Sequence, residues 1–460
     1  MVDHEAEIRR IRDELDDLQR RSADEMRAQQ DRRLASLVRF HLARSLNPAY
    51  REFLRAHGVE HEDDLPRSVA ELARLPITSR AFLQESNYAA RPCVPPEEVQ
   101  KVIETSGTSG NPLRLPYTYE MTRRSYQDLL ARAFIIGGVD PLVPSYWVVH
   151  WEPGGKDDWS SHLGARSFEA LAGEGRALVA STRTAAAEHW QCLAAHRPRW
   201  AVSAPVFFMA FAAYCEHEGL DLASCSLQRL MLGGATCLPE DRAMIRRAYG
   251  AEHVHMFYPS TEALVMGSEL PDGSGYVCFE DEVLVDVVDA HGLPVKIGER
   301  GRVLLTYLCC RGFPVIRYAI GDAATYLGAA PGFPGFKLIA DINRIDAGEI
   351  GEARLPFSEI ELMPRQFLGR GVPVRAFQIA RRRLGVKDVP VFRIETAVAD
   401  RATIERIALD VFTQNPQMKD MLDSGMIHAP AVELYPPGGL TRGRFKVPLY
   451  VDERQQQYEQ

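Results

Sequence analysis

A run of small and hydroxylated residues near position 105 is the segment of this sequence best suited to binding an anion. It reads TSGTSGNP over residues 105–112 and follows Glu104. Gly, Ser and Thr let successive backbone N–H groups approach an anion without obstruction, and the hydroxyls add donors for phosphate oxygens or water around Mg²⁺. The run lacks the GK[ST] ending of the Walker loop, and a plain surface loop can have the same composition. The residues alone leave both interpretations open.

Two acidic residues and one basic residue stand in segments that could act with this loop. Glu262 ends YPSTE, Asp322 ends PVIRYAIGD, and Lys446 ends GRFK near the C-terminus. Carboxylate oxygens suit Mg²⁺, and an ammonium group can stabilise charge that develops during a reaction. Gly-Asp is also a common turn dipeptide, and a lone Lys is usually a solvated surface residue. Their order along the chain favours a shared function.

In this order, the segments resemble the motifs of the adenylate-forming superfamily, which includes acyl-CoA synthetases, luciferases and peptide-synthetase adenylation domains. TSGTSGNP resembles the family's phosphate loop [ST]SGTTGKP, with Asn111 in place of Lys. YPSTE resembles YGxTE with Pro259 in place of Gly, and PVIRYAIGD resembles PxxRYxTGD. LGGA over residues 232–235 is similar to the adenine-contacting turn. NRID over residues 343–346 is similar to the GRxD hinge, with Asn343 in place of Gly.

The resemblance implies a role for each of these residues. Thr261 would contact the α-phosphate of ATP, Glu262 would hold Mg²⁺ together with Thr108, and Asp322 would accept both ribose hydroxyls. Lys446, with Arg442 and Arg444 as nearby alternatives, would bridge the acid and the α-phosphate. The nucleotide-binding residues that it implies are Thr105, Ser106, Gly107, Thr108, Ser109, Gly110, Gly233, Gly234, Ala235, Tyr258, Pro259, Ser260, Thr261, Asp322 and Arg344.

The N-terminal segments narrow the resemblance to the phenylacetate–CoA ligase-like branch. DELDDLQ, LASLVRFHLARSLNPAYREFLRAHGV and LARLPITSRAFLQ follow that branch's pattern, with the phosphate loop early in the chain. The implied reaction activates a small, aromatic carboxylic acid as acyl-AMP and transfers it to coenzyme A. A carrier-protein phosphopantetheine thiol or an amine is the alternative acceptor, and a non-catalytic nucleotide-binding homologue is an alternative of another class. The resemblance is compatible with a homodimer.

The acid pocket is expected near the start of a helix at 203–209 and in the segments 233–235 and 257–263. Its candidate residues are Phe207, Phe208, Phe257 and Ala263, and Trp151 is also apolar enough to contact an aromatic acid. Aromatic walls would suit an aromatic acid, although core packing also explains each aromatic residue.

The elements that must position these segments are predicted from apolar periodicity. Short apolar runs at 146–149, 177–180, 200–203 and 229–232 alternate with helical patterns at 187–196 and 206–218. This alternation predicts an α/β domain with a parallel sheet. We expect a large domain over residues 1–342, with a helical region at 1–95 (a helix over 3–45) and a β-rich subdomain at about 282–327. A smaller, mobile α+β domain is expected over 343–460, with strands near 374–379, 391–396 and 431–434, a helix at 402–412, and the hinge at 343–346.

Composition excludes several classes of protein. The 54 Lys and Arg against 62 Asp and Glu give a net charge of -8, which argues against a nucleic-acid scaffold. No apolar run reaches the length of a membrane span, and no secretory signal is evident, so a cytoplasmic protein is expected. The eight cysteines form no CxxC pair. Some relatives bind zinc near Cys278, Cys309 and Cys310, but the expected His is missing here, so zinc is not expected.

Overall fold

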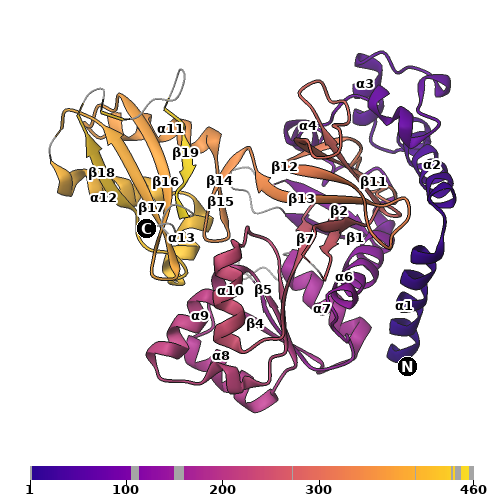
Figure 1. The fold of residues 1–460 in the computed structure, drawn as a ribbon. Coiled ribbons are helices and arrows are strands. Elements are labelled where there is room, and N and C mark those ends of the chain that lie inside the picture. The colour runs from indigo at the N-terminus through magenta and orange to yellow at the C-terminus, as the bar shows by residue number, and fades with distance from the viewer. Residues whose placement is uncertain are drawn as a thin grey trace.

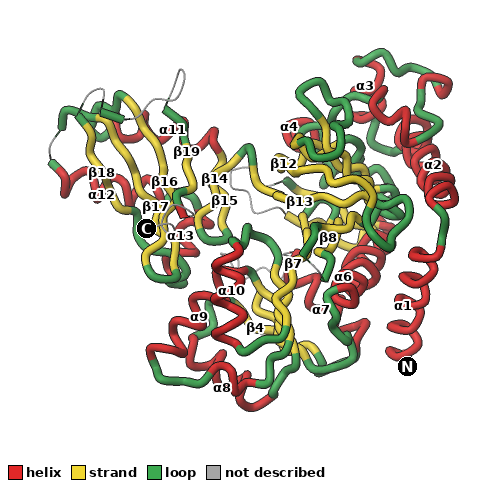
Figure 2. Tube along the Cα trace, in the orientation of Figure 1, coloured by secondary structure: helices red, strands yellow, loops and turns green. Residues whose placement is uncertain are grey.

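The computed structural model describes residues 3–104, 113–149, 160–271, 273–398, 400–436, 439–440 and 447–454. A large sheet with helices packed on its faces occupies the centre, the N-terminal helices lie along one side, and a C-terminal α+β part lies on the other (Figure 1). Figure 2 shows strands in yellow in both parts, with the helices in red and the loops in green. The predicted α/β fold with a smaller C-terminal part is confirmed.

Two long helices begin the chain, α1 (His4–Arg20) and α2 (Ala23–Arg39). The apolar stripe of α1 is buried against α6 and α7. The predicted single helix over 3–45 is wrong at one place, because Ser22 and Glu25 form a capping box that starts a new helix. The Ser79 side chain caps α4 by accepting a hydrogen bond from the Phe82 N–H. The shorter elements are η1 (Phe40–Arg44), α3 (Ala49–Ala56), η2 (Glu62–Asp64), η3 (Val69–Arg74), α4 (Arg80–Glu85) and η4 (Pro96–Glu98).

Parallel strands form one half of the large sheet, in the order β4-β3-β5-β6-β7. Successive side chains face opposite sides, so Trp147 packs with α6 and α7 while Tyr146 packs with α8 and α9. The strands are β3 (Ser145–Val149), β4 (Ala177–Ser181), β5 (Trp200–Ser203), β6 (Arg229–Leu232) and β7 (His253–Ser260). The helical elements around them are α5 (Tyr119–Thr122), η5 (Arg123–Leu129), α6 (Leu130–Ile136), α7 (Ser160–Ala172), α8 (Ala186–His196), α9 (Pro205–His217), η6 (Leu222–Cys225) and α10 (Pro239–Tyr249).

The β-rich segment continues the same sheet instead of forming a separate unit. Beyond β7 the strand order is β8-β9-β13-β12-β11-β10, and all these pairs are antiparallel. The sheet is therefore mixed and not largely parallel, because hairpin connections replace helical crossovers after β7. The strands are β8 (Leu264–Glu269), β9 (Tyr276–Cys278), β10 (Val283–Val288), β11 (Arg300–Tyr307), β12 (Tyr318–Ala329) and β13 (Lys337–Arg344). A small hairpin, β1 (Val99–Glu104) and β2 (Arg114–Thr118), flanks residues 105–112.

The chain leaves the large sheet at Arg344, within the residues expected to form the hinge. The C-terminal part contains a four-stranded sheet in the order β18-β17-β16-β19 and a separate hairpin, β14-β15. Its strands are β14 (Ala347–Ile350), β15 (Ala353–Pro356), β16 (Ala376–Leu384), β17 (Lys387–Glu395), β18 (Ala431–Tyr435) and β19 (Tyr450–Asp452). Its helices are α11 (Phe357–Leu368), α12 (Arg401–Phe412) and α13 (Pro416–Asp423).

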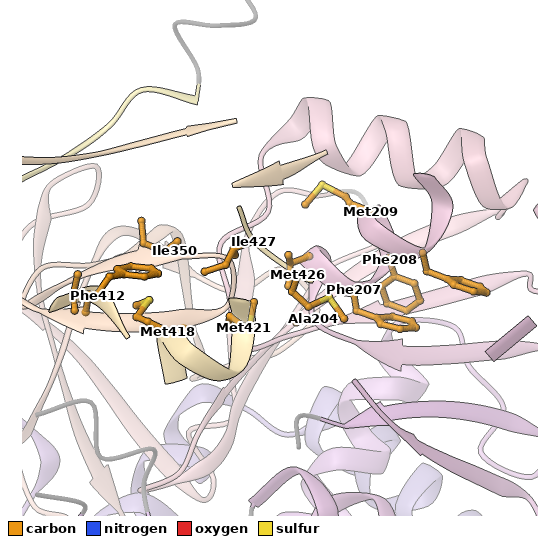
Figure 3. Close-up of a cluster of buried hydrophobic side chains, with 14 of the residues drawn as sticks. Ala204, Phe207, Phe208, Met209, Ile350, Phe412, Met418, Met421, Met426 and Ile427 are labelled. Atoms are coloured by element: carbon orange, nitrogen blue, oxygen red, sulfur yellow. The ribbon is translucent and has the colours of Figure 1, made fainter. Parts of the chain in front are cut away.

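The two parts share one apolar core. Met426 lies beside Ala204 and Phe207 at the contact in Figure 3, and Ile427 and Met421 extend the cluster into the C-terminal part. Two ion pairs, Arg183–Asp420 and Arg383–Asp241, also join the parts, and both aspartates are almost fully buried. Across the described ranges, no helix combines the length and the apolar character needed to cross a membrane.

Candidate active site

Two adjoining cavities lie at the carboxyl ends of the parallel strands. One has a volume of about 260 Å³ and the other of about 600 Å³. Residues after β5 and β6, such as Ala204 and Gly234, contribute to their walls, as expected for ligand sites in open parallel sheets. Arg354 and Phe257 line both cavities, so the two spaces meet at these side chains.

The larger cavity contains a carboxylate held by two protein donors. The Tyr258 hydroxyl donates to Asp322 Oδ2 at 2.6 Å, and Arg344 Nη1 donates to Asp322 Oδ1 at 2.9 Å. Burial and the Asp322 charge raise the pKa of Tyr258 well above its usual value, so it stays a donor. Burial opposes the charge of Arg344, but the ion pairs with Asp322 and Asp346 overcome this and raise its pKa. The carboxylate is fixed in direction and keeps lone pairs for a further donor.

Two glycines allow the close approaches that this geometry requires. Gly321 has φ +88°, and a Cβ on it would lie 2.1 Å from Asp346 Oδ2. A Cβ on Gly233 would lie 2.7 Å from the ring of Phe257. A larger residue at 233 would displace Phe257 of the cavity wall, and one at 321 would displace Asp346, which pairs with Arg344.

Glu262 follows β7 and lies close to Arg344 of the larger cavity, but it is part of neither cavity lining. Glu262 is buried and accepts a hydrogen bond from the Tyr318 hydroxyl at 3.0 Å, and Arg80 Nη1 lies 3.8 Å from its carboxylate. Thr261 lines the smaller cavity, and its carbonyl accepts from the Tyr117 hydroxyl. Sequence reasoning missed Arg80, although its place at the start of α4 after LPITS offered a signal.

Glu262 fits one limited way of holding Mg²⁺. No group of three or more His, Cys, Asp or Glu side chains that could hold a metal occurs in the described part of the chain. Mg²⁺ commonly keeps several waters and binds through one or two carboxylates plus substrate phosphates, so a single carboxylate is compatible with it. Burial raises the pKa of Cys93, Cys215 and Cys237 to about 12, so these three thiols stay protonated.

The smaller cavity is mainly apolar. Trp147, Phe257, Leu130 and Val202 line it from the large sheet and α6, and Gly164 of α7 forms another part of its wall. Residues 352–354 and Gln417 of the C-terminal part also line it. Sequence reasoning missed Trp147, whose signal was its place near the carboxyl end of a buried strand.

Three of the four residues expected in an acid pocket lie elsewhere. Phe207 packs on His189 and Phe211, and Phe208 packs on Tyr249, so both belong to the core between α8, α9 and α10. Ala263 is fully buried and absent from both linings. The expectation failed because α9 starts at Pro205 and turns residues 207 and 208 away from the cavity, leaving Ala204 to line it.

The structure brings together most of the expected nucleotide residues that it describes. Tyr258, Pro259, Gly234, Ala235, Asp322 and Arg344 line the larger cavity, and Gly233, Ser260 and Thr261 line the smaller. Thr105, Ser106, Gly107, Thr108, Ser109, Gly110, Asn111, Trp151, Arg442, Arg444 and Lys446 lie outside the described residues. Glu104, which immediately precedes the glycine-rich run, lines the smaller cavity.

Comparison with known proteins finds similar ligases. No family model matches the chain. A phenylacetate–coenzyme A ligase of Aromatoleum evansii is 27% identical over 322 residues, covering 68% of this chain and 69% of that protein. The ligase of Thermus thermophilus is 25% identical over 386 residues, covering 81% and 82%. A solved structure of 2-hydroxyisobutyryl-CoA ligase with 2-HIB-AMP and CoA, in its thioesterification state, has TM-score 0.76 at 22% identity and covers 95% of this chain and 92% of that one.

The chain is therefore similar to phenylacetate–CoA ligases, and its fold matches that of adenylate-forming enzymes. The adenylate-forming fold has the same two parts in this chain and in the solved ligase. The postadenylation state of that ligase gives TM-score 0.62 at the same identity and coverage. The fold of this chain is therefore more similar to the thioesterification-state structure than to the postadenylation-state structure.

Proposed function

We propose that this protein is an AMP-forming acid–thiol ligase, which activates a small carboxylic acid as acyl-AMP and transfers the acyl group to coenzyme A. The observation that carries the proposal is the pair of adjoining cavities: a polar one around Asp322 and an apolar one around Trp147 and Phe257. An acyl-adenylate needs such a pair, because its adenosine and acyl group differ in polarity.

The residues of the predicted motifs have distinct proposed roles in the first half-reaction. Asp322, held by Tyr258 and Arg344, would accept the ribose hydroxyls of ATP in a bidentate manner. The acid carboxylate would attack the α-phosphorus, and pyrophosphate would leave. Lys446 is proposed to stabilise the charge that develops there. Glu262, with Thr108, would hold Mg²⁺, which supplies charge neutralisation of the phosphates.

The acceptor in the second half-reaction is coenzyme A in this proposal. A carrier-protein phosphopantetheine thiol or an amine is the alternative. One structural neighbour, the amide bond synthetase McbA of Marinactinospora thermotolerans, has TM-score 0.51 at 16% identity. A small aromatic acid, a homodimer and a cytoplasmic location are further parts of the proposal. After adenylation, a hinge motion at 343–346 would move Lys446 away, so that the acceptor can attack the acyl-adenylate.

The test measures acid-dependent pyrophosphate release from Mg·ATP across aryl and short aliphatic acids, without and then with coenzyme A. We expect release with at least one acid and acceleration by coenzyme A. If coenzyme A does not change the rate of pyrophosphate release, the result would favour a carrier protein or an amine as the acceptor. Bound ATP without release for any acid, in a protein where Lys446→Ala changes nothing, would favour the non-catalytic alternative.

A further inference from the structure

The contact between the two cavities contains one cationic side chain. Among the described residues, Gly234, Phe257, Pro259 and Arg354 line both spaces, and only Arg354 is charged. In an acyl-adenylate, a single phosphate joins the acyl group to the adenosine. If the apolar cavity takes the acyl group and the polar cavity takes the adenosine, the phosphate must lie where the cavities meet, beside Arg354.

Arg354 is held at this place by the β14-β15 hairpin. It pairs across the hairpin with Glu349, and its neighbours Ala353 and Leu355 are buried in the core that joins the two parts. Its backbone N–H donates to Gln417 Oε1 at 3.4 Å. These contacts fix the backbone of Arg354 through the C-terminal part, so the guanidinium enters the site only when that part is placed as it is here.

The neighbouring arginine is already committed to other groups. Arg344 pairs with Asp322 at 2.9 Å and with Asp346 at 2.7 Å. For the Arg354 guanidinium, the described residues provide no hydrogen bond or ion pair, and Asp346 is a nearby charge. In addition, Asn111 brings no charge to the glycine-rich run. Arg354 is therefore the cation best placed to meet a phosphate at the junction.

We propose that Arg354 binds the α-phosphate of the acyl-adenylate, and then of AMP, while the acceptor thiol attacks. This inference rests on the proposed function. The sulfur–acyl carbon bond forms, the bond between the acyl carbon and the phosphate oxygen breaks, and AMP leaves with the electron pair while the thiol proton passes to solvent. A guanidinium beside the phosphate stabilises the negative charge that the leaving group gains. Because Arg354 moves with the C-terminal part, it serves the second half-reaction.

The test compares the binding of AMP and adenosine, which differ only in the phosphate, by isothermal titration calorimetry. We expect Arg354→Ala to weaken AMP binding about 10-fold or more, the scale of a lost charge-assisted hydrogen bond, and to leave adenosine binding within about 2-fold. Arg354→Lys should restore part of the AMP affinity. Arg370→Ala, which removes an exposed arginine paired with Asp410 in the same part, is the matched control and should change neither affinity.

The outcomes separate the two proposals. An unchanged ratio of AMP to adenosine affinity in Arg354→Ala overturns the role of Arg354 and leaves the ligase proposal standing. Equal weakening of both ligands also overturns it, because that result reports a structural effect on the whole cavity. A wild-type protein that binds neither ligand overturns the proposed nucleotide site itself.

Discussion

The two cavities of the candidate site are built in different ways. The larger is walled by short segments with polar side chains that bond directly to one another, as in the contacts of Tyr258 and Arg344 with Asp322. The smaller is walled mainly by apolar residues from the strands β3, β5, β7 and β8, the helical elements η5, α6 and α7, and the C-terminal hairpin. A hydrogen-bonded cavity depends on individual atoms, whereas an apolar cavity depends on volume. Substitutions in the two cavities should therefore impair ligand binding in different ways.

The largest effect is expected in the larger cavity. Asp322→Ala removes the acceptor for ribose and leaves the Tyr258 hydroxyl and the Arg344 guanidinium without their bonds. Each lost charge-assisted bond costs about 1.5–3 kcal/mol, so pyrophosphate release should fall about 10²- to 10³-fold. AMP titration should show the same loss. Asp410→Ala, an exposed carboxylate on α12, is the control. Unchanged AMP binding in Asp322→Ala would contradict the placement of the nucleotide.

A volume change should affect only the smaller cavity. Gly164→Leu puts a side chain into the cavity wall, where a Cβ would already lie 3.4 Å from the Tyr126 ring. Overpacking costs of about 1–3 kcal/mol predict a KM for the acid that rises about 10- to 100-fold for the bulkiest accepted acid. Adenosine affinity should stay within about 2-fold. A parallel loss of adenosine binding would show that the two cavities are not independent.

A weaker and indirect effect is expected where the two parts meet. Arg183→Met removes the ion pair with Asp420 and loosens the C-terminal part, which covers the smaller cavity through Ala353 and Gln417. A partly exposed pair is worth about 1 kcal/mol, so the KM for the acid should rise about 5-fold. Arg197→Met, which removes an exposed guanidinium that donates to the Ser226 hydroxyl, is the control. If acid KM is unchanged and adenosine affinity falls, the pair supports the other cavity.

The last effect is on stability and not on ligand binding, and it concerns β7, a strand that both cavities share. Burial lowers the pKa of His255 to about 3, so the folded protein keeps it neutral while the unfolded chain binds a proton below pH 6.5. The stability that neutral His255 contributes is therefore lost as the pH falls from 6.5 towards 3. One such proton changes the free energy of unfolding by about 1.4 kcal/mol per pH unit. We expect urea denaturation between pH 6.5 and 5 to show a shallower dependence of the unfolding free energy on pH in His255→Gln. The difference from the wild-type slope should correspond to one proton. An identical slope in both proteins would mean that His255 is protonated in the folded state.

The contrast between the cavities explains which parts of the site could be predicted. The segments around Gly234, Tyr258, Asp322 and Arg344 in the larger cavity were identifiable from the sequence, because each is part of a short motif. The acid pocket was not, since Trp147, Leu130 and Gly164 come from separate elements with no motif of their own. Phe207 and Phe208 look equally suitable in the sequence, but the direction of α9 places them in the core. Arg80 and Arg354 were missed for the same reason: a lone arginine gains its meaning from what folds next to it.

The sequence by itself determined the local elements and their order, because apolar periodicity and capping residues act over a few positions. It placed β3 to β6 within one residue at each end. Only the tertiary structure decided that the β-rich strands extend the parallel sheet, that the two cavities meet at Arg354, and that the C-terminal part closes over both. These depend on which surfaces bury one another across hundreds of residues, and burial is a property of the whole packed chain.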